Sequence, residues 1–282
     1  MIILKNSIDV AEQLKKSTLA RSTIGFVPTM GALHPGHIKL IEQSKKKCDV
    51  TVCSIFVNPT QFNNIEDFKK YPVTIEQDIY LLEKNGCDLL FIPDVKEIYP
   101  EGTNPSSYFD LGYLETILEG KYRPGHFQGV CRVVKKLMEI VSPHHLFLGQ
   151  KDYQQCMVIK RLLEITNSTA KLNICPTLRH EDGLAMSSRN TRLSSDEKLL
   201  ATEIYKTLLF LKEKLQIGDV EQLKNEATKY LASNGFRTDY VEIAEKHSLN
   251  IISDWDGIIE PVALIAAFIG DVRLIDNLIL SD

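Results

Sequence analysis

About the first 175 residues alternate short apolar runs with amphipathic helical patterns, and this alternation constrains the fold more than any other feature. The run Val50–Val57 is rich in β-branched residues and continuously hydrophobic, which is typical of a central parallel strand. Other strands are expected at residues 24–27, 88–92, 145–148 and 172–175, and helices at residues 37–47, 74–85, 128–141 and 153–166. Because strands linked through helices form parallel sheets, we expect an α/β domain, a parallel sheet with helices on both faces.

The pattern changes after Arg179. Two long helical stretches, at about residues 195–216 and 219–234, are followed by strand-like runs at residues 240–244, 262–269 and 274–280. Helices followed by adjacent strands are typical of a small α+β domain. We therefore expect a large domain over residues 1–178 and a small C-terminal α+β domain over residues 179–282.

Charge, hydropathy and cysteine content argue against several classes of protein. The net charge of −4 argues against a nucleic-acid-binding protein, because contact with phosphate backbones needs a basic face. No apolar run approaches the roughly 18 residues that span a membrane, and the start lacks the pattern of a secretory signal. None of the six cysteines forms a C-x-x-C pair, so we expect small buried side chains in a reducing compartment, by default the cytoplasm.

The segment Pro28–His37, with the sequence PTMGALHPGH, follows an expected strand and opens an expected helix. Gly31 and Gly36 let the backbone approach a ligand closely, and the free amides at a helix start favour a bound anion. His34 and His37 are three residues apart, so both can lie on one side of the first turn and donate to phosphate oxygens. Two histidines that merely decorate a helix start are the ordinary interpretation, but the complete unit is more specific than that.

This H-x-G-H element is similar to the signature of the nucleotidyltransferase superfamily, whose members attack the α-phosphate of a nucleotide and release pyrophosphate. Neither a P-loop nor a G-x-G-x-x-G dinucleotide motif occurs in a suitable place, which argues against both of those nucleotide-binding classes. The pattern therefore favours nucleotidyl transfer from ATP.

Two further polar segments follow expected strands. Residues 58–62, Asn-Pro-Thr-Gln-Phe, offer the uncharged amides of Asn58 and Gln61 for a hydroxy acid, although a capped turn would explain the same residues. Residues 149–155, Gly-Gln-Lys-Asp-Tyr-Gln-Gln, place Lys151 at a strand–helix junction, although a capped surface helix is the simpler explanation. Since ligands of an open parallel sheet bind at the carboxyl ends of its strands, we favour a binding function for both segments.

The fourth segment, residues 182–190, reads Asp-Gly-Leu-Ala-Met-Ser-Ser-Arg-Asn. Two hydroxyls and the guanidinium of Arg189 in a loop that contains Gly183 indicate a mobile clamp for phosphate, because arginine can bind two oxygens at once. An ordinary polar linker is the alternative. The segment also resembles the M-S-K loop of class I aminoacyl-tRNA synthetases, with arginine supplying the cation.

Together, the four segments resemble the pantothenate synthetase (pantoate–β-alanine ligase) family in order and spacing. The segments RPGHFQGV at residues 123–130 and KYP at residues 70–72 add to the resemblance, which runs over nearly the whole chain and is densest in residues 26–190. It implies a Rossmann-like N-terminal domain, a small C-terminal domain that acts as a lid, and a homodimer. It also implies two reactions: pantoate and ATP with Mg²⁺ give pantoyl adenylate and pyrophosphate, and β-alanine then gives pantothenate and AMP.

The same resemblance implies roles for individual residues. His37 is the residue to which the family pattern points as catalytic, with His34, Lys151 and Arg189 beside it. Gln61 and Gln155 would hold pantoate, with Asn58 and His126 nearby. The implied ATP-binding residues are Met30, Gly31, Ala32, Leu33, His34, Pro35, Gly36, His37, Gly149, Gln150, Lys151, Asp152, Leu178, Met186, Ser187, Ser188 and Arg189. The protein ligands of Mg²⁺ are unknown at this point; Asp78 is a candidate, although a solvated helix carboxylate is the expected alternative.

Three alternatives remain open from the sequence. Another H-x-G-H nucleotidyltransferase, acting on a different small acid or phosphate ester, would usually be shorter and would lack both glutamine-containing segments. A tRNA synthetase fragment fits the short tail and acidic charge poorly. A nucleotide-binding regulator without turnover is disfavoured because His37, Lys151 and Arg189 are all present.

Overall fold

The computed structural model describes residues 1–19, 21–63, 65–104 and 108–281. The chain forms two compact units, the first made of Met1–Gly149 and Val158–Pro176, the second of Gln150–Met157 and Thr177–Asp282. The break after Pro176 lies close to the expected domain boundary at 178/179. In addition, the short segment 150–157 groups with the second unit.

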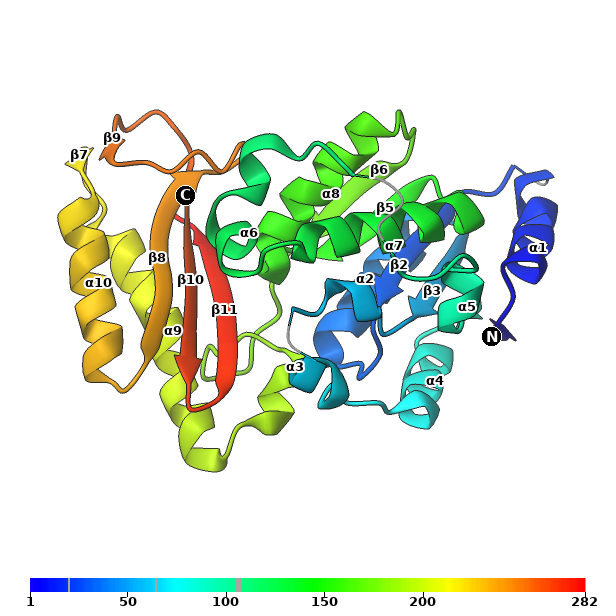
Figure 1. The fold of residues 1–282 in the computed structure, drawn as a ribbon, viewed down its shortest axis with the longest axis horizontal. Coiled ribbons are helices and arrows are strands. Elements are labelled where there is room, and N and C mark those ends of the chain that lie inside the picture. Colours follow the sequence, from blue (N-terminus) through cyan, green and yellow to red (C-terminus); the bar gives the residue numbers. More distant parts are fainter. Residues whose placement is uncertain (20, 64, 105–107, 282) are drawn as a thin grey trace. The chain divides into compact units, whose positions relative to one another are not determined.

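The first unit is built on a six-stranded sheet in the order β1-β4-β3-β2-β5-β6, and every neighbouring pair is parallel. Figure 1 labels β2, β3, β5 and β6 of this sheet. The strands are β1 (Ile2–Leu4), β2 (Ile24–Thr29), β3 (Val50–Ile55), β4 (Leu89–Phe91), β5 (His145–Gly149) and β6 (Lys171–Cys175). The expectation of a parallel α/β sheet is confirmed. The edge strand β1 was not expected, since only three residues pair there and the run carries no alternating pattern.

Eight helices of the first 176 residues surround this sheet in the described ranges: α1 (Ser7–Leu19), α2 (Pro35–Lys47), α3 (Ile65–Lys69), α4 (Ile75–Lys84), α5 (Val95–Ile98), α6 (Leu118–Tyr122), α7 (His126–Val141) and α8 (Tyr153–Ile165). The connections through α2 and α4 lead toward the β1 edge, whereas those through α7 and α8 lead toward β6. Because parallel crossovers are right-handed, the two pairs of helices cover opposite faces. Short 3₁₀ helices are η1 (Pro59–Gln61) and η2 (Gly112–Glu115) in the first unit, and η3 (Gln150–Asp152) and η4 (Ser188–Arg192) in the second.

Strand β2 is the centre of this arrangement because it pairs with β3 on one side and β5 on the other. The chain leaves β2 toward one edge of the sheet and leaves β5 toward the other edge. Such a reversal is the topological switch point at which open α/β sheets bind ligands, beyond the carboxyl ends of the strands. The turn after β2 and the end of β5 at Gly149 therefore lie where a ligand is expected.

The core of the first unit is apolar and closely packed. Val27, Ile55, Leu90 and Phe147 of four neighbouring strands pack with Leu40, Ile41 and Leu82 of α2 and α4, and all are nearly or fully buried. All six cysteines are free and buried, as the sequence predicts. Burial raises the pKa of Cys87 and Cys131 to about 12, so both thiols stay protonated at neutral pH.

The second unit combines two helices with a three-stranded antiparallel sheet in the order β11-β10-β8 (Figure 1). Its elements are α9 (Ser195–Lys214), α10 (Glu221–Ser233), β8 (Arg237–Glu245), β10 (Pro261–Ile269), β11 (Val272–Ile279) and the short pair β7 (Gly218–Asp219) with β9 (Asp254–Trp255). Leu208 and Leu211 of α9 pack with Leu231 of α10 and with Ile243 and Ile265 of the sheet. This is the small α+β domain expected from the sequence.

Helix α9 begins with a reciprocal cap. The Ser194 hydroxyl accepts a hydrogen bond from the Glu197 amide at 3.2 Å, and the Glu197 carboxylate accepts one from the Ser194 amide at 2.8 Å.

Within the described ranges, no helix combines the length and apolar character needed to cross a bilayer.

Candidate active site

The turn that follows β2, residues 30–34, has a tightly specified backbone. Gly31 has a φ of +82° and Ala32 a φ of +49°. A Cβ on Gly31 would lie 3.1 Å from an oxygen of Asp78 and 3.1 Å from Ile55, so a side chain at position 31 would be both strained and crowded. The Gly31 amide donates to the Thr29 hydroxyl at 3.2 Å, and that hydroxyl donates to the Ser54 carbonyl at 2.7 Å.

The carboxylate of Asp78, on helix α4, holds this turn in place. One oxygen accepts from the Ala32 amide at 2.9 Å, and the other accepts from the Leu33 amide at 2.8 Å and from the Thr74 hydroxyl at 3.1 Å. The residue is fully buried. Hydrogen bonds of this kind to an ionised group are stronger than neutral ones, and they compensate for the removal of the charge from water.

The expectation that Asp78 is a solvated helix carboxylate is therefore wrong. Its side chain lies on the same face of α4 as the apolar residues Ile75 and Leu82, which turns it toward the sheet. Both of its oxygens are already used by protein donors, so Asp78 is also a poor candidate for a magnesium ligand. Among the described residues there is no group of three or more His, Cys, Asp or Glu side chains that could hold a metal ion.

His34 and His37 form a reciprocal cap at the start of α2. His34 is the N-cap, and its Nδ1 accepts from the Gly36 amide at 3.2 Å, while Nδ1 of His37 accepts from the His34 amide at 3.3 Å. The ring centroids are 4.0 Å apart, so the two imidazoles lie on one side of the turn as predicted. Because each Nδ1 accepts a hydrogen bond, each ring carries its proton on Nε2 and presents Nε2–H as a donor.

Helix α2 itself favours an anion at this end. Pro35 occupies the first turn, where its missing amide hydrogen costs nothing, and no acidic residue lies in that turn. The last turn carries three lysines, which complement the negative end of the helix dipole. The amino end of α2 therefore combines a positive partial charge with two imidazole donors.

Gln61 and Asn58 lie together in the turn after β3. The amide nitrogen of Asn58 donates to Oε1 of Gln61 and to the Gly129 carbonyl, each at 3.1 Å. Its oxygen accepts from the Thr60 amide at 3.3 Å and from the Tyr99 hydroxyl at 2.9 Å. Asn58 is fully buried and all of its bonding capacity is used, so it orients Gln61 rather than reaching a ligand.

This orientation decides what Gln61 can offer. Because its Oε1 accepts from Asn58, its Nε2 carries the available donors, and one of them is directed at the sulfur of Met30 at 2.8 Å. Nε2 has two hydrogens, so the second is the one that a ligand can use. Met30 and Gln61, predicted to contact different substrates, therefore touch each other.

His126, the first residue of α7, contacts the turn that contains Asn58 and Gln61. Its Nδ1 lies 2.7 Å from the Gln61 carbonyl oxygen and must carry a hydrogen there, since a carbonyl only accepts. The side chain is buried. Gly129, one turn further along, allows the helix backbone to approach closely, because a Cβ there would lie 2.2 Å from the Thr60 carbonyl oxygen.

Of the remaining predicted residues, Gly149 ends β5 in the first unit and the others lie in the second unit. Lys151 and Asp152 form the 3₁₀ helix η3 just before α8, with the Lys151 ammonium 3.7 Å from the Asp152 carboxylate. Gln155 follows in the first turn of α8 and is partly exposed.

The segment from Leu178 to Asn190 is tied down more firmly than an open loop. The Met186 amide donates to the Leu178 carbonyl at 3.0 Å, and Arg179 and Ala185 form an antiparallel bridge. Ser187 caps η4 by accepting from the Arg189 amide at 3.3 Å. Residues 178–186 are therefore a tight hairpin followed by a single helical turn.

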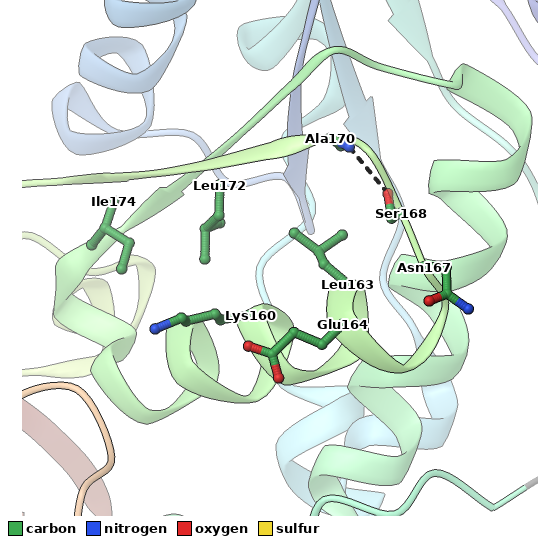
Figure 2. A pocket seen from close by; sticks show the side chains of 8 residues that line it. All are labelled: Lys160, Leu163, Glu164, Asn167, Ser168, Ala170, Leu172 and Ile174. Atoms are coloured by element: carbon green, nitrogen blue, oxygen red, sulfur yellow. Dashed lines mark hydrogen bonds between the residues drawn. The ribbon is translucent and has the colours of Figure 1, made fainter.

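A shallow hollow of about 580 Å³ lies alongside β6 and contains none of the predicted residues (Figure 2). Its lining comes from α8, from the turn before β6 and from β6 itself: Lys160, Leu163, Glu164, Asn167, Ser168, Ala170, Leu172 and Ile174. The turn at residues 167–170 belongs to the amino end of β6, whereas ligands of such sheets bind at the carboxyl ends.

Comparisons with known proteins identify the family of this chain. The model of the pantoate-beta-alanine ligase family matches residues 2–279. The chain belongs to this family. A pantothenate synthetase from Cytophaga hutchinsonii is 45% identical over 97% of this chain and 95% of its own length.

Solved structures are similar throughout. The crystal structure of pantothenate synthetase from Thermus thermophilus is 38% identical, with a TM-score of 0.90 over 100% of both chains. A pantoate-beta-alanine ligase from Francisella tularensis, crystallised with β-γ ATP and β-alanine, is 40% identical, with a TM-score of 0.81 over 99% of this chain and 98% of that one. As a member of the family, this protein is an enzyme of the ligase class.

Within this ligase fold, the sequence interpretation missed the supporting residues. Asp78 interrupts the apolar face Ile75–Ile79–Leu82 of an amphipathic helix, and a carboxylate at such a position is a recognisable sign of a buried partner. Asp276 and Asn277 likewise interrupt an apolar strand and are both buried. Gly129 carries no comparable signal, because a close backbone approach becomes visible only in three dimensions.

We expect Asp78→Asn to destabilise the protein by about 1–3 kcal/mol, because one of the two turn amides would face an NH₂ group and lose its acceptor inside the core. Urea unfolding of the variant measures this difference. Glu76→Gln is the matched control: Glu76 lies in the same helical turn but is exposed, so its change should stay within about 0.5 kcal/mol. Equal midpoints for Asp78→Asn and the wild-type protein would contradict the role of this carboxylate.

Proposed function

We propose that this protein condenses pantoate with β-alanine at the expense of ATP, through a pantoyl-adenylate intermediate, and releases pyrophosphate and AMP. The observation that carries the proposal is the pair of imidazoles at the amino end of α2, each with its proton on Nε2. The arrangement lies at the topological switch point of the sheet, in a chain of the pantoate-β-alanine ligase family.

In the first step, a carboxylate oxygen of pantoate attacks the α-phosphorus of ATP, and the bond to the bridging oxygen of pyrophosphate breaks. Negative charge then builds on the phosphate oxygens. Nε2–H of His34 and His37, together with the amides at the start of α2, donate to those oxygens as the charge grows. Met30, Gly31, Ala32, Leu33, Pro35 and Gly36 supply the backbone on which the nucleotide lies.

Cationic side chains complete the phosphate contacts. We assign Lys151 and Arg189 to the phosphates, with the Ser187 and Ser188 hydroxyls as further donors. Gly149, Gln150, Asp152, Leu178 and Met186 are assigned to the rest of the nucleotide. Because Mg²⁺ prefers substrate phosphates and water as ligands, we propose that it arrives as the metal of MgATP, without a dedicated protein cage.

Pantoate is assigned to Gln61 and Gln155. Both are neutral, so they can hydrogen-bond a hydroxy acid without neutralising the carboxylate that must attack. Gln61 offers its second Nε2 hydrogen, and Asn58 and His126 act through it by fixing its side chain and its carbonyl.

In the second step, the amine of β-alanine attacks the acyl carbon and AMP leaves with the oxygen that came from pantoate. The attacking nitrogen releases one proton to solvent as the amide forms. Neither step requires a covalent bond to the protein, so orientation and charge stabilisation are sufficient.

Two further proposals concern the setting of the reaction. We propose that the protein acts as a homodimer, as the family resemblance implies. We also propose the cytoplasm as its compartment, and the six free, buried cysteines support that location.

Exchange of labelled pyrophosphate into ATP tests the reaction class. We expect exchange that requires pantoate and Mg²⁺ but no β-alanine, since the first step alone is reversible. An amino acid in place of pantoate, and no acid at all, serve as controls for a synthetase-like or unspecific activity. Exchange that appeared only when β-alanine was added would rule out the two-step scheme.

His37→Ala should lower the rate of adenylate formation by roughly 10²–10³-fold, because a donor to the developing phosphate charge is lost. ATP affinity should fall much less, since the α2 amides remain. Rapid-quench measurement of a single turnover gives the rate, and calorimetric titration gives the affinity.

His37→Gln is the matched control for this histidine. Glutamine at the third helical position can still cap the His34 amide and retains an N–H donor, so the variant should fold as stably as the wild-type protein and react faster than His37→Ala. A wild-type single-turnover rate for His37→Ala would refute the assigned role.

A further inference from the structure

Strand β11 carries two consecutive buried polar residues, Asp276 and Asn277, with 5% and 2% of their surface exposed. The strand lies at an edge of the three-stranded sheet, because among the described strands it pairs only with β10. Consecutive side chains of a strand point to opposite faces, so the two residues serve different neighbours. Each neighbour is a segment that we assign to the nucleotide.

Asn277 holds the turn that contains Lys151. Its Nδ2 donates to the carbonyls of Gln150 and Lys151, each at 2.9 Å, and its Oδ1 accepts from the Gln150 side chain at 3.2 Å. Both hydrogens of the amide are therefore used on two successive backbone carbonyls. This arrangement fixes the backbone of η3 and thus the direction in which the side chain of Lys151 points.

Asp276 holds the hairpin that contains Gly183. Its carboxylate accepts two bonds from the Arg179 guanidinium, at 2.5 and 3.0 Å, and the same guanidinium donates to the Gly183 carbonyl at 3.1 Å. Arg179 also stacks on the ring of Tyr205, 3.9 Å from its centroid. Burial raises the pKa of Asp276 and Arg179 opposes that rise, as expected for a paired charge away from water.

The two halves are joined to each other. The backbone N–H of Asn277 donates to the Asp276 carboxylate at 2.8 Å, and Arg179 donates to the backbone carbonyl of Asn277 at 3.3 Å. Gly183 has a φ of +92°, and a Cβ there would lie 2.3 Å from the Tyr205 ring, so the hairpin backbone packs directly against this ring and only glycine fits at this position.

We propose that Asp276 and Asn277 are positioning residues for the nucleotide site: they set the backbones that present Lys151 on one side and Ser187–Arg189 on the other. The proposal rests on the function proposed above. Neither residue is expected to touch the substrate. Their contribution is to hold the cationic side chains of Lys151 and Arg189 in place. A displacement of about 1 Å in a reacting group can lower the rate roughly 10²-fold.

Asn277→Asp is the sharpest test, because it keeps the shape of the side chain but turns both donors into an anionic oxygen facing two carbonyl oxygens. We expect kcat for pantoate-dependent exchange to fall by roughly 10²-fold and ATP affinity to fall by about tenfold. The KM for pantoate should stay within about twofold, because the glutamines assigned to pantoate are not held by Asn277.

Arg273→Gln is the matched control on the same strand. Arg273 is paired with Asp239 at 2.8 Å, so its loss should lower the unfolding midpoint without changing kcat. Amide hydrogen exchange over residues 150–153 should become faster in Asn277→Asp and remain unchanged in Arg273→Gln.

The outcomes separate the two proposals. Wild-type kcat in Asn277→Asp, with only a lower unfolding midpoint, would overturn the positioning role and leave a purely structural one. If the wild-type protein itself showed no pantoate-dependent exchange, the proposed function would fail. The positioning role of Asn277 would then be tested by ATP titration alone. Weaker ATP binding in Asn277→Asp, but not in Arg273→Gln, would support the positioning role of Asp276 and Asn277. Equal ATP binding in the wild-type protein and both variants would overturn that role.

Discussion

The buried carboxylate of Asp78 is the interaction on which the rest of the site depends. Its two oxygens hold the amides of Ala32 and Leu33, so the turn between β2 and α2 keeps a backbone that its own residues would not prefer. That turn sets the entry of the chain into α2 and thus the positions of His34 and His37. Because the carboxylate is removed from water, the cost of its desolvation is recovered only when the turn has the correct shape.

In the second unit, buried polar side chains also fix the backbone, but Asn277 donates hydrogen bonds where Asp78 accepts them. There, the buried amide of Asn277 donates to backbone carbonyls, and the buried carboxylate of Asp276 acts through an arginine. In both units, a side chain far away in sequence fixes the backbone of a polar segment. A site that works by orientation and charge needs such support, since its donors must already point at the phosphates before charge develops.

The sequence predicted most of the architecture because periodicity and turn residues are local signals. The long helices and central strands appear within a few residues of the expected positions, and Gly86 follows the end of α4 with the positive φ expected of a C-terminal cap. The pairing of His34 with His37 followed from their spacing. The role of Asp78 did not, since the turn amides that it holds lie 45 and 46 residues away. Likewise, Asn58 looked like a ligand contact or a turn cap, and only its complete set of buried partners distinguishes the two.

The central claim is that pantoate is activated by attack of its carboxylate on the α-phosphorus of ATP. It is tested most directly by following the carboxylate oxygens of pantoate labelled with ¹⁸O through one complete reaction with ATP and β-alanine. Mass spectrometry of the products should show one labelled oxygen in AMP and the other in the amide carbonyl of pantothenate. Label in pyrophosphate or orthophosphate, with unlabelled AMP, would contradict the adenylate and with it the role assigned to the two histidines.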